Sequence, residues 1–180
     1  MSVTREILRS YRRPRQVMRA LIEGNRASDR PEARGFIYLV VGLLIIFLSQ
    51  IPDLTGAGLA SLDMPDRLAG EDGPAPLDAR LAITLFAWIF VWPLILYLFG
   101  GLIHVLAGLL GGQGRGVDSR MALFWAILAV SPLFLLRGMA SVSQSVAAVT
   151  VLNYAIAAGF FWIWLSALFE AEGGQGQDPS

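Results

Sequence analysis

Long apolar stretches alternate with short polar segments along the whole of this chain. A helix needs about 20 mostly apolar residues to cross a hydrocarbon core of about 30 Å. Four stretches approach or exceed that length with almost no charge, and the pattern predicts a membrane-spanning helix in each. The predicted spans are residues 35–52, 81–112, 121–137 and 146–169.

The second stretch, 81–112, is too long for one straight crossing. As a helix it would extend about 48 Å, because each residue adds about 1.5 Å. Pro93 and the pair Gly100 and Gly101 weaken the helical backbone, so we expect a kinked span that bends at one of these places. Two alternatives stay open: two short crossings, which would add a fifth span, or one crossing followed by a helix in the membrane interface.

Residues 1–34 are different, because apolar side chains recur at helical spacing over 3–24 and arginines are frequent at the positions between them. Pro14 interrupts the pattern. This predicts a basic amphipathic arm that lies at an anionic membrane surface, although a solvated charge run that only sets the topology would show similar composition. The arginines expected at the surface are Arg9, Arg12, Arg13, Arg15 and Arg19.

The basic residues are unevenly distributed. All fourteen are arginines, and nine of them precede the first span. The loop 53–80 contains two arginines and six acidic residues. By the positive-inside rule, we expect the N-terminus of this multi-pass protein to be cytoplasmic and the loop 53–80 to lie outside. Arg137 alone falls on the wrong side. The Gly, Pro and Ala content of 53–80 predicts a flexible acidic loop, and 171–180 is predicted to be a disordered tail.

The composition agrees with this pattern. Of 180 residues, 55% are hydrophobic and 16% are charged, and the mean hydropathy is +0.58. Ordinary soluble domains carry about 25% charged residues. We therefore expect an all-α fold: a polytopic transmembrane helical bundle with about four spans and an N-terminal basic amphipathic helix. A cleaved signal peptide is a weaker interpretation of the N-terminal region, because three further apolar stretches follow the first.

The only histidine lies in a glycine-rich part of the second stretch. Four residues there recur at every fourth position and so share one face of a helix, where small residues let a neighbouring helix approach closely. They are Gly100, His104, Gly108 and Gly112. An ionisable group on such a face is a candidate for function. However, the chain has no second His, no Cys and no carboxylate inside the spans to complete a metal site or a proton relay. We therefore expect His104 to pack through an interhelical hydrogen bond.

Asn153 and Tyr154 lie inside the fourth stretch, where each polar group needs a partner. Candidate chemistry is otherwise lacking: we find no nucleophile with a nearby base and no phosphate-binding glycine motif. The aromatic residues lie mainly in the spans and not among the arginines, which argues against nucleic-acid binding. We expect a non-enzymatic protein with no metal or other cofactor.

Several segments of the chain resemble bacterial members of the Ypt-interacting-protein (Yip) family. The resemblance covers roughly residues 10–170 and is clearest in the Pro-Arg segment before the first span, in LYLFGGLIHVLAGLLGGQG and in SRMALFWAILAVSPLFLL. It implies a polytopic helical membrane domain over 35–170, a cytoplasmic N-terminal arm and no known catalytic centre. Eukaryotic relatives associate with small Rab-type GTPases. They usually have five spans where this chain shows four, so we do not carry GTPase binding over to it.

The leading functional hypothesis is a membrane scaffold or organiser that acts through helix–helix association. Its partners would be the lipid bilayer, anionic lipids at the arm, and either other membrane proteins or further copies of the chain in a homo-oligomer. The alternative is a small transporter or permease with a broken second span. Transport usually requires a charge inside the membrane or an internal repeat, and neither is evident in this sequence.

Overall fold

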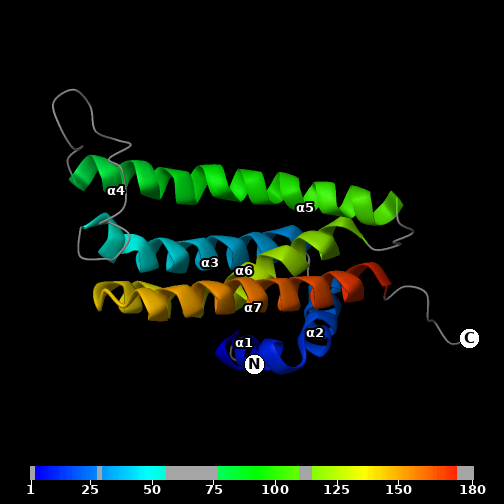
Figure 1. The fold of residues 1–180 in the computed structure, drawn as a ribbon. Coiled ribbons are helices and arrows are strands. Elements are labelled where there is room, and N and C mark those ends of the chain that lie inside the picture. Colours follow the sequence, from blue (N-terminus) through cyan, green and yellow to red (C-terminus); the bar gives the residue numbers. More distant parts are fainter. Residues whose placement is uncertain (1–2, 28–29, 56–76, 110–114, 174–180) are drawn as a thin grey trace, which may run out of the picture.

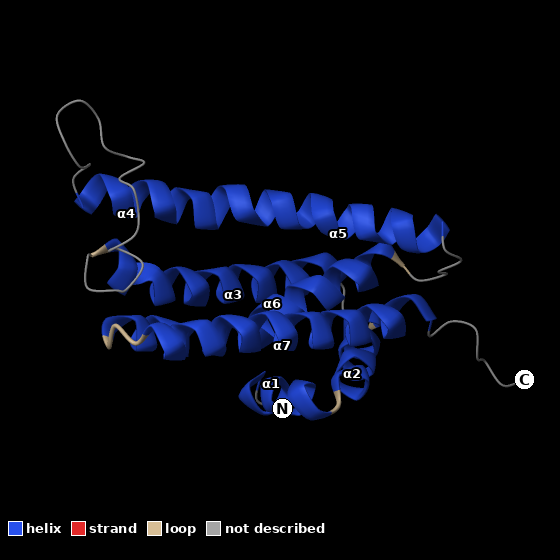
Figure 2. Ribbon diagram, viewed as in Figure 1, coloured by secondary structure: helices blue, strands red, loops and turns tan. Residues whose placement is uncertain are grey.

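The computed structural model describes residues 3–27, 30–55, 77–109 and 115–173. Every regular element in these ranges is a helix, which confirms the expected all-α fold (Figure 2). The elements are α1 (Val3–Arg12), α2 (Pro14–Arg26), α3 (Pro31–Leu54), α4 (Leu77–Phe86), the π-helical turn η2 (Ala87–Val91), α5 (Trp92–Leu109), α6 (Gly116–Val142) and α7 (Val146–Gly173).

Four of the described helical segments are long and apolar enough to cross a membrane. They are Glu32–Leu54, Leu77–Leu109, Gly116–Val142 and Val146–Ala171. These segments coincide with the four predicted spans and are the helices of a multi-pass membrane protein. The third is longer than the predicted 121–137, because Asp118 and Ser119, whose polarity set the predicted boundary, are buried in the first turns of α6.

The second span is a single helical segment without a separate crossing or interfacial helix in its described part. Its irregularity is η2, which lies immediately before Pro93, and the helix continues regularly through Gly100 and Gly101. Proline lacks the N–H that an α-helix needs, and its ring crowds the carbonyl four residues earlier. The wider π turn relieves this crowding. The irregularity in this span thus lies just before Pro93, and the glycine pair lies within regular α-helix.

Helix α6 forms the centre of the bundle and packs between α3 and α7 (Figure 1). Residues 121–131 of α6 are buried without interruption, so both apolar and small side chains there face neighbours. In an apolar stretch of 18 residues within its span, 67% of the residues are buried, against 6% in such a stretch of the span that contains α4 and α5. That second span therefore lies at the periphery, on the side of α3 and α6 opposite the N-terminal helices (Figure 1).

Glycines bring α3 and α6 close together. A Cβ atom on Gly42 would lie 3.2 Å from the backbone of Leu128, and one on Gly138 would collide with the backbone carbonyl oxygen of Ser49. Small residues allow this approach because no side chain separates the two backbones. The closest approach of two backbones at a described glycine thus joins α3 and α6, whereas Gly100 of the second span meets the flexible side chain of Arg120.

Helix α6 continues through Pro132, which has no N–H to donate to the carbonyl of Leu128. The Ser131 hydroxyl donates a hydrogen bond to that carbonyl instead, over 2.9 Å. Because the freed acceptor has a new donor, the proline does not end the helix.

The N-terminal arm, which we define as α1 and α2, divides at Pro14 as predicted and packs against α6 and α7. The Tyr11 hydroxyl donates a hydrogen bond to the carbonyl of Ala129, the central residue of α6, over 2.8 Å. The Trp125 indole N–H donates to the Ser10 hydroxyl over 2.9 Å. The apolar face of α2 is buried, including Met18. The arm is therefore an integral part of the bundle.

Candidate functional sites

A cluster of polar side chains, which we call the Asp53 cluster, joins the C-terminal ends of α3 and α6 to α7. Asp53 is buried, and its carboxylate accepts hydrogen bonds from the Ser141 hydroxyl and from the Arg137 guanidinium, the latter at 3.3 Å. Arg137 Nε donates to the Asn153 side-chain oxygen over 2.9 Å. The cluster thus ties three spans together with one ion pair and its hydrogen bonds.

The Asp53 cluster answers two questions raised by the sequence. Arg137, the exception to the positive-inside rule, is paired with a carboxylate, so its charge is compensated locally. Asn153 has the partner that an intramembrane amide requires. Sequence reasoning missed Asp53 because it was assigned to the flexible loop 53–80, whereas α3 extends through it to Leu54. Residues 56–76 of that loop lie outside the described residues, and its last part, 77–80, is helical because it begins α4.

A second charged group lies at the opposite ends of α3 and α6. Glu32 accepts hydrogen bonds from the Tyr97 hydroxyl at 3.1 Å and from the Arg120 guanidinium at 3.4 Å. The Arg120 guanidinium also lies over the Tyr97 ring, 4.8 Å from its centroid. Such a cation–π contact with partial exposure stabilises by about 0.5–1 kcal/mol. The group fixes the position of α5 against the rest of the bundle.

The predicted face of glycines and histidine is divided in the structure. Gly100 is buried, and a Cβ there would lie 2.8 Å from the Arg120 side chain. His104 is half-buried beside Gly116, where an added Cβ would lie 3.0 Å from its ring. Gly108 is exposed and would meet no atom within 4 Å. Gly112 lies outside the described residues. These residues therefore do not form one interface within the chain.

Tyr154 and its neighbour Asn153 are both exposed on α7, and Tyr154 is 74% exposed. Asn153 accepts the hydrogen bond from Arg137 and belongs to the Asp53 cluster.

Comparison of the chain with protein-family models, with curated proteins and with solved structures returned no match. The resemblance to the Yip family therefore stays a prediction. Function has to be argued from the geometry of the described residues.

An apolar cavity of about 460 Å³ lies between α3, the second span, α6 and α7. Trp88 and Trp92 line it from the π-helical region, and their rings stack with centroids 5.5 Å apart. Phe134 and Phe160 contribute from α6 and α7. Asn153 also lines the cavity, which brings the Asp53 cluster to its edge. The cavity could hold an apolar group with a polar end.

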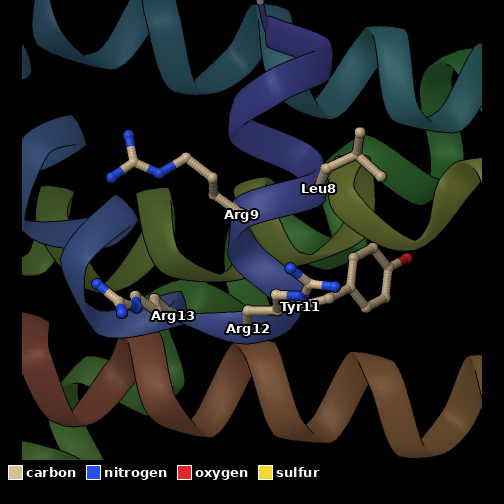
Figure 3. A pocket seen from close by; sticks show the side chains of 5 residues that line it. All are labelled: Leu8, Arg9, Tyr11, Arg12 and Arg13. Carbon is tan, nitrogen blue, oxygen red and sulfur yellow. The ribbon is translucent and has the colours of Figure 1, made fainter.

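The arm borders two further hollows, each of about 680 Å³. Figure 3 shows the side chains that line the first: Leu8, Arg9, Tyr11, Arg12 and Arg13. The second, which we call the arm groove, lies between the arm and α7 and includes Arg12, Arg13 and Arg15. Of the predicted surface arginines, Arg19 instead pairs with Glu170 of α7 at 2.7 Å.

Among the described residues, no group of three or more His, Cys, Asp or Glu side chains is placed to hold a metal ion. Three ion pairs link helices: Arg19 with Glu170, Arg120 with Glu32, and Arg137 with Asp53. These pairs can position helices, and they offer no arrangement of a nucleophile beside a base.

Proposed function

We propose that this chain is a non-enzymatic multi-pass protein of the bacterial inner membrane that organises other membrane proteins, or further copies of itself, through helix–helix association. The observation that carries the proposal is the exposure of the second span, in which only 6% of the residues of an apolar stretch of 18 are buried within the chain. A long apolar helix with so few internal contacts offers most of its surface to lipid or to another helix.

The small residues of α5 favour a helix partner. Gly101 and Gly108 are seven positions apart and so lie on nearly the same face. A Cβ on either would meet no atom within 4 Å, in contrast to Gly100, which faces Arg120. Another helix could therefore approach the outer face of α5 closely without displacing any part of this chain.

The organisation of the chain also supports membership of the Yip family and a cytoplasmic N-terminus. The described residues form an N-terminal basic arm followed by four apolar helices, which is the organisation that the resemblance implies. Nine of the fourteen arginines precede the first span, which favours a cytoplasmic N-terminus.

The test is association in the membrane. The chain has no cysteine, so Val105→Cys, between the two open glycines, provides a single site for oxidative crosslinking. We expect a defined crosslinked product that falls about tenfold when Gly101 and Gly108 are both replaced by Leu. Gly100 is kept, because a side chain there would collide with Arg120 and disturb the bundle itself.

The matched control is Ala147→Leu with Ala155→Leu, which adds the same kind of bulk to exposed positions of α7. The control should leave the product unchanged. Affinity capture of the intact protein from the same membranes then shows whether the product contains a second copy or another protein. Unchanged crosslinking after the change at Gly101 and Gly108 would overturn the proposal.

A small transporter is the second candidate, and one observation favours it. The π-helical turn before Pro93 places Trp88 and Trp92 at the apolar cavity, and such turns are frequent at functional sites. If crosslinking gives no product and the purified protein in liposomes moves an apolar solute, the transporter replaces the scaffold as the better proposal.

A further inference from the structure

The arm groove combines two chemically different walls. The wall from the arm is cationic and polar, and the wall from α7 is mainly apolar. The arm residues are Arg12, Arg13, Pro14, Arg15 and Gln16, and the α7 residues are Ala158, Phe161, Trp162, Leu165, Ser166 and Phe169. A molecule that fills this groove therefore needs an anionic part and an apolar part.

The arginines of the groove have no counter-charge of their own. Within the described residues, no carboxylate pairs with Arg12, Arg13 or Arg15, and all three are exposed. Arg19, one turn further along α2, is instead paired with Glu170. Three unpaired guanidinium groups near one another repel, and an anion among them would relieve that repulsion. Arginine also suits a phosphate especially well, because its N–H groups match the phosphate oxygens.

The location of the groove indicates the source of the anion. The hydrogen bond from Tyr11 to the Ala129 carbonyl holds α1 against a membrane-spanning helix, so the neighbouring arginines lie close to the lipid, where a charge without a partner is costly. The α7 wall from Ala158 to Phe169 extends about 16 Å along the helix. That length is close to one leaflet of a core of about 30 Å. A lipid of the surrounding leaflet can supply both a phosphate and an apolar chain at this place.

We propose that the arm groove binds one anionic phospholipid of the leaflet at the N-terminal side. Its phosphate contacts the guanidinium groups of Arg12, Arg13 and Arg15, and one acyl chain lies along the apolar side chains of α7. Trp162, whose side chain is 58% exposed, provides the largest apolar surface of that wall. The lipid would fix the arm to α7 by joining the cationic wall to the apolar one. This site is separate from the outer face of α5 and does not depend on helix association there.

The first experiment uses the unmodified full-length protein, purified in a nonionic detergent with equal amounts of phosphatidylglycerol and phosphatidylcholine. Native mass spectrometry should show one phosphatidylglycerol molecule retained per chain, in preference to phosphatidylcholine. Equal retention of the two lipids would overturn the proposal without any variant. An excess of inorganic phosphate should not displace the lipid; displacement would show that the arginines bind a free anion.

The second experiment separates the groove from general positive charge. Arg12→Gln with Arg15→Gln should lower retention of phosphatidylglycerol by about 30-fold, since each arginine near anionic lipid contributes on the order of a fivefold effect. The control, Arg80→Gln with Arg115→Gln, removes the same charge elsewhere and should retain the lipid. An equal loss in both variants would show that only net charge matters and would overturn the proposal.

The apolar wall is tested by Trp162→Ala, which leaves every arginine in place. Retention of phosphatidylglycerol should fall, because the acyl chain loses the largest side chain it contacts. If Trp162→Ala retains as much phosphatidylglycerol as the unmodified protein, the acyl chain does not lie along α7 as proposed. These changes leave α5 untouched. Crosslinking through Val105→Cys should therefore be the same in these variants as in the unmodified protein, so the lipid test and the scaffold test can fail independently.

Discussion

At the scale of single residues, Gly138 shows how little space separates α3 from α6. A Cβ atom there would collide with the backbone carbonyl oxygen of Ser49. A carbonyl oxygen in a regular helix cannot move aside as the end of a flexible side chain can. Crowding at such a contact costs about 1–3 kcal/mol, because the two helices have to separate.

We therefore expect Gly138→Ala to lower the midpoint of thermal unfolding of the purified protein in detergent. Gly101→Ala is the matched control, since it makes the same change in an apolar helix where the new Cβ meets no atom within 4 Å. Loss of helical circular dichroism during heating measures both midpoints. A midpoint for Gly138→Ala equal to that of the unmodified protein would contradict the close contact with Ser49.

The roles of individual glycines and of the histidine could be predicted only in part. The sequence indicates that Gly100 and His104 occupy one helix, and their four-residue spacing predicts that both face a neighbour. It does not show that the neighbour is the first part of α6, with Arg120 against Gly100 and Gly116 against His104. That pairing depends on how α5 and α6 are aligned, which no spacing within one helix determines.

At the scale of elements, the arm is held to α6 by a partly buried hydrogen bond from Tyr11 to the Ala129 carbonyl. Burial raises the pKa of Tyr11 above its ordinary value of 10.0, because the charged phenolate loses water contacts. The docked arm therefore favours the protonated phenol. Its contribution to docking is complete below pH 10.0 and is lost as the pH rises through the raised pKa.

We expect Tyr11→Phe to weaken docking of the arm, because the Ala129 carbonyl loses this donor while the ring remains. Hydrogen exchange of residues 3–26 should become faster, and its increase at alkaline pH should be smaller than in the unmodified protein. Tyr154→Phe, which removes an exposed hydroxyl on α7, is the control and should leave exchange of the arm unchanged. Unaltered exchange in Tyr11→Phe would show that this hydrogen bond does not hold the arm.

The second span shows how much of a single helix can be predicted from its own sequence. Its length and apolar composition predict one irregular helix, and proline predicts where the backbone departs from α-helical geometry. The departure takes the form of a π turn, η2, ahead of Pro93, which turns Trp88 and Trp92 toward the apolar cavity. That cavity requires α3, α6 and α7 as its other walls, so it is not evident in the span alone.

At the scale of the whole molecule, the nine arginines before the first span are the main determinant of the predicted orientation. The α6–α7 turn and the start of α6 should consequently lie on opposite sides of the membrane. Because the chain has no cysteine, Ser143→Cys and Arg115→Cys each introduce a single site for labelling.

In intact spheroplasts, a membrane-impermeant maleimide should label Ser143→Cys, whereas Arg115→Cys should be labelled only after the membrane is opened. Both side chains are exposed, so access depends on the side of the membrane. Labelling of both cysteines after opening confirms that each can react. The reverse pattern in intact spheroplasts would contradict a cytoplasmic N-terminus.

The sequence by itself determined that this protein is helical, where its four spans lie and that its arm divides at Pro14, because hydrophobic length and the missing proline N–H act locally along the chain. Only the tertiary structure decided that Asp53 meets Arg137, that Gly138 meets Ser49 and that the arm packs against α6 and α7. Those contacts join residues distant in sequence, so they depend on the alignment and rotation of whole helices, which the packing of the complete bundle sets.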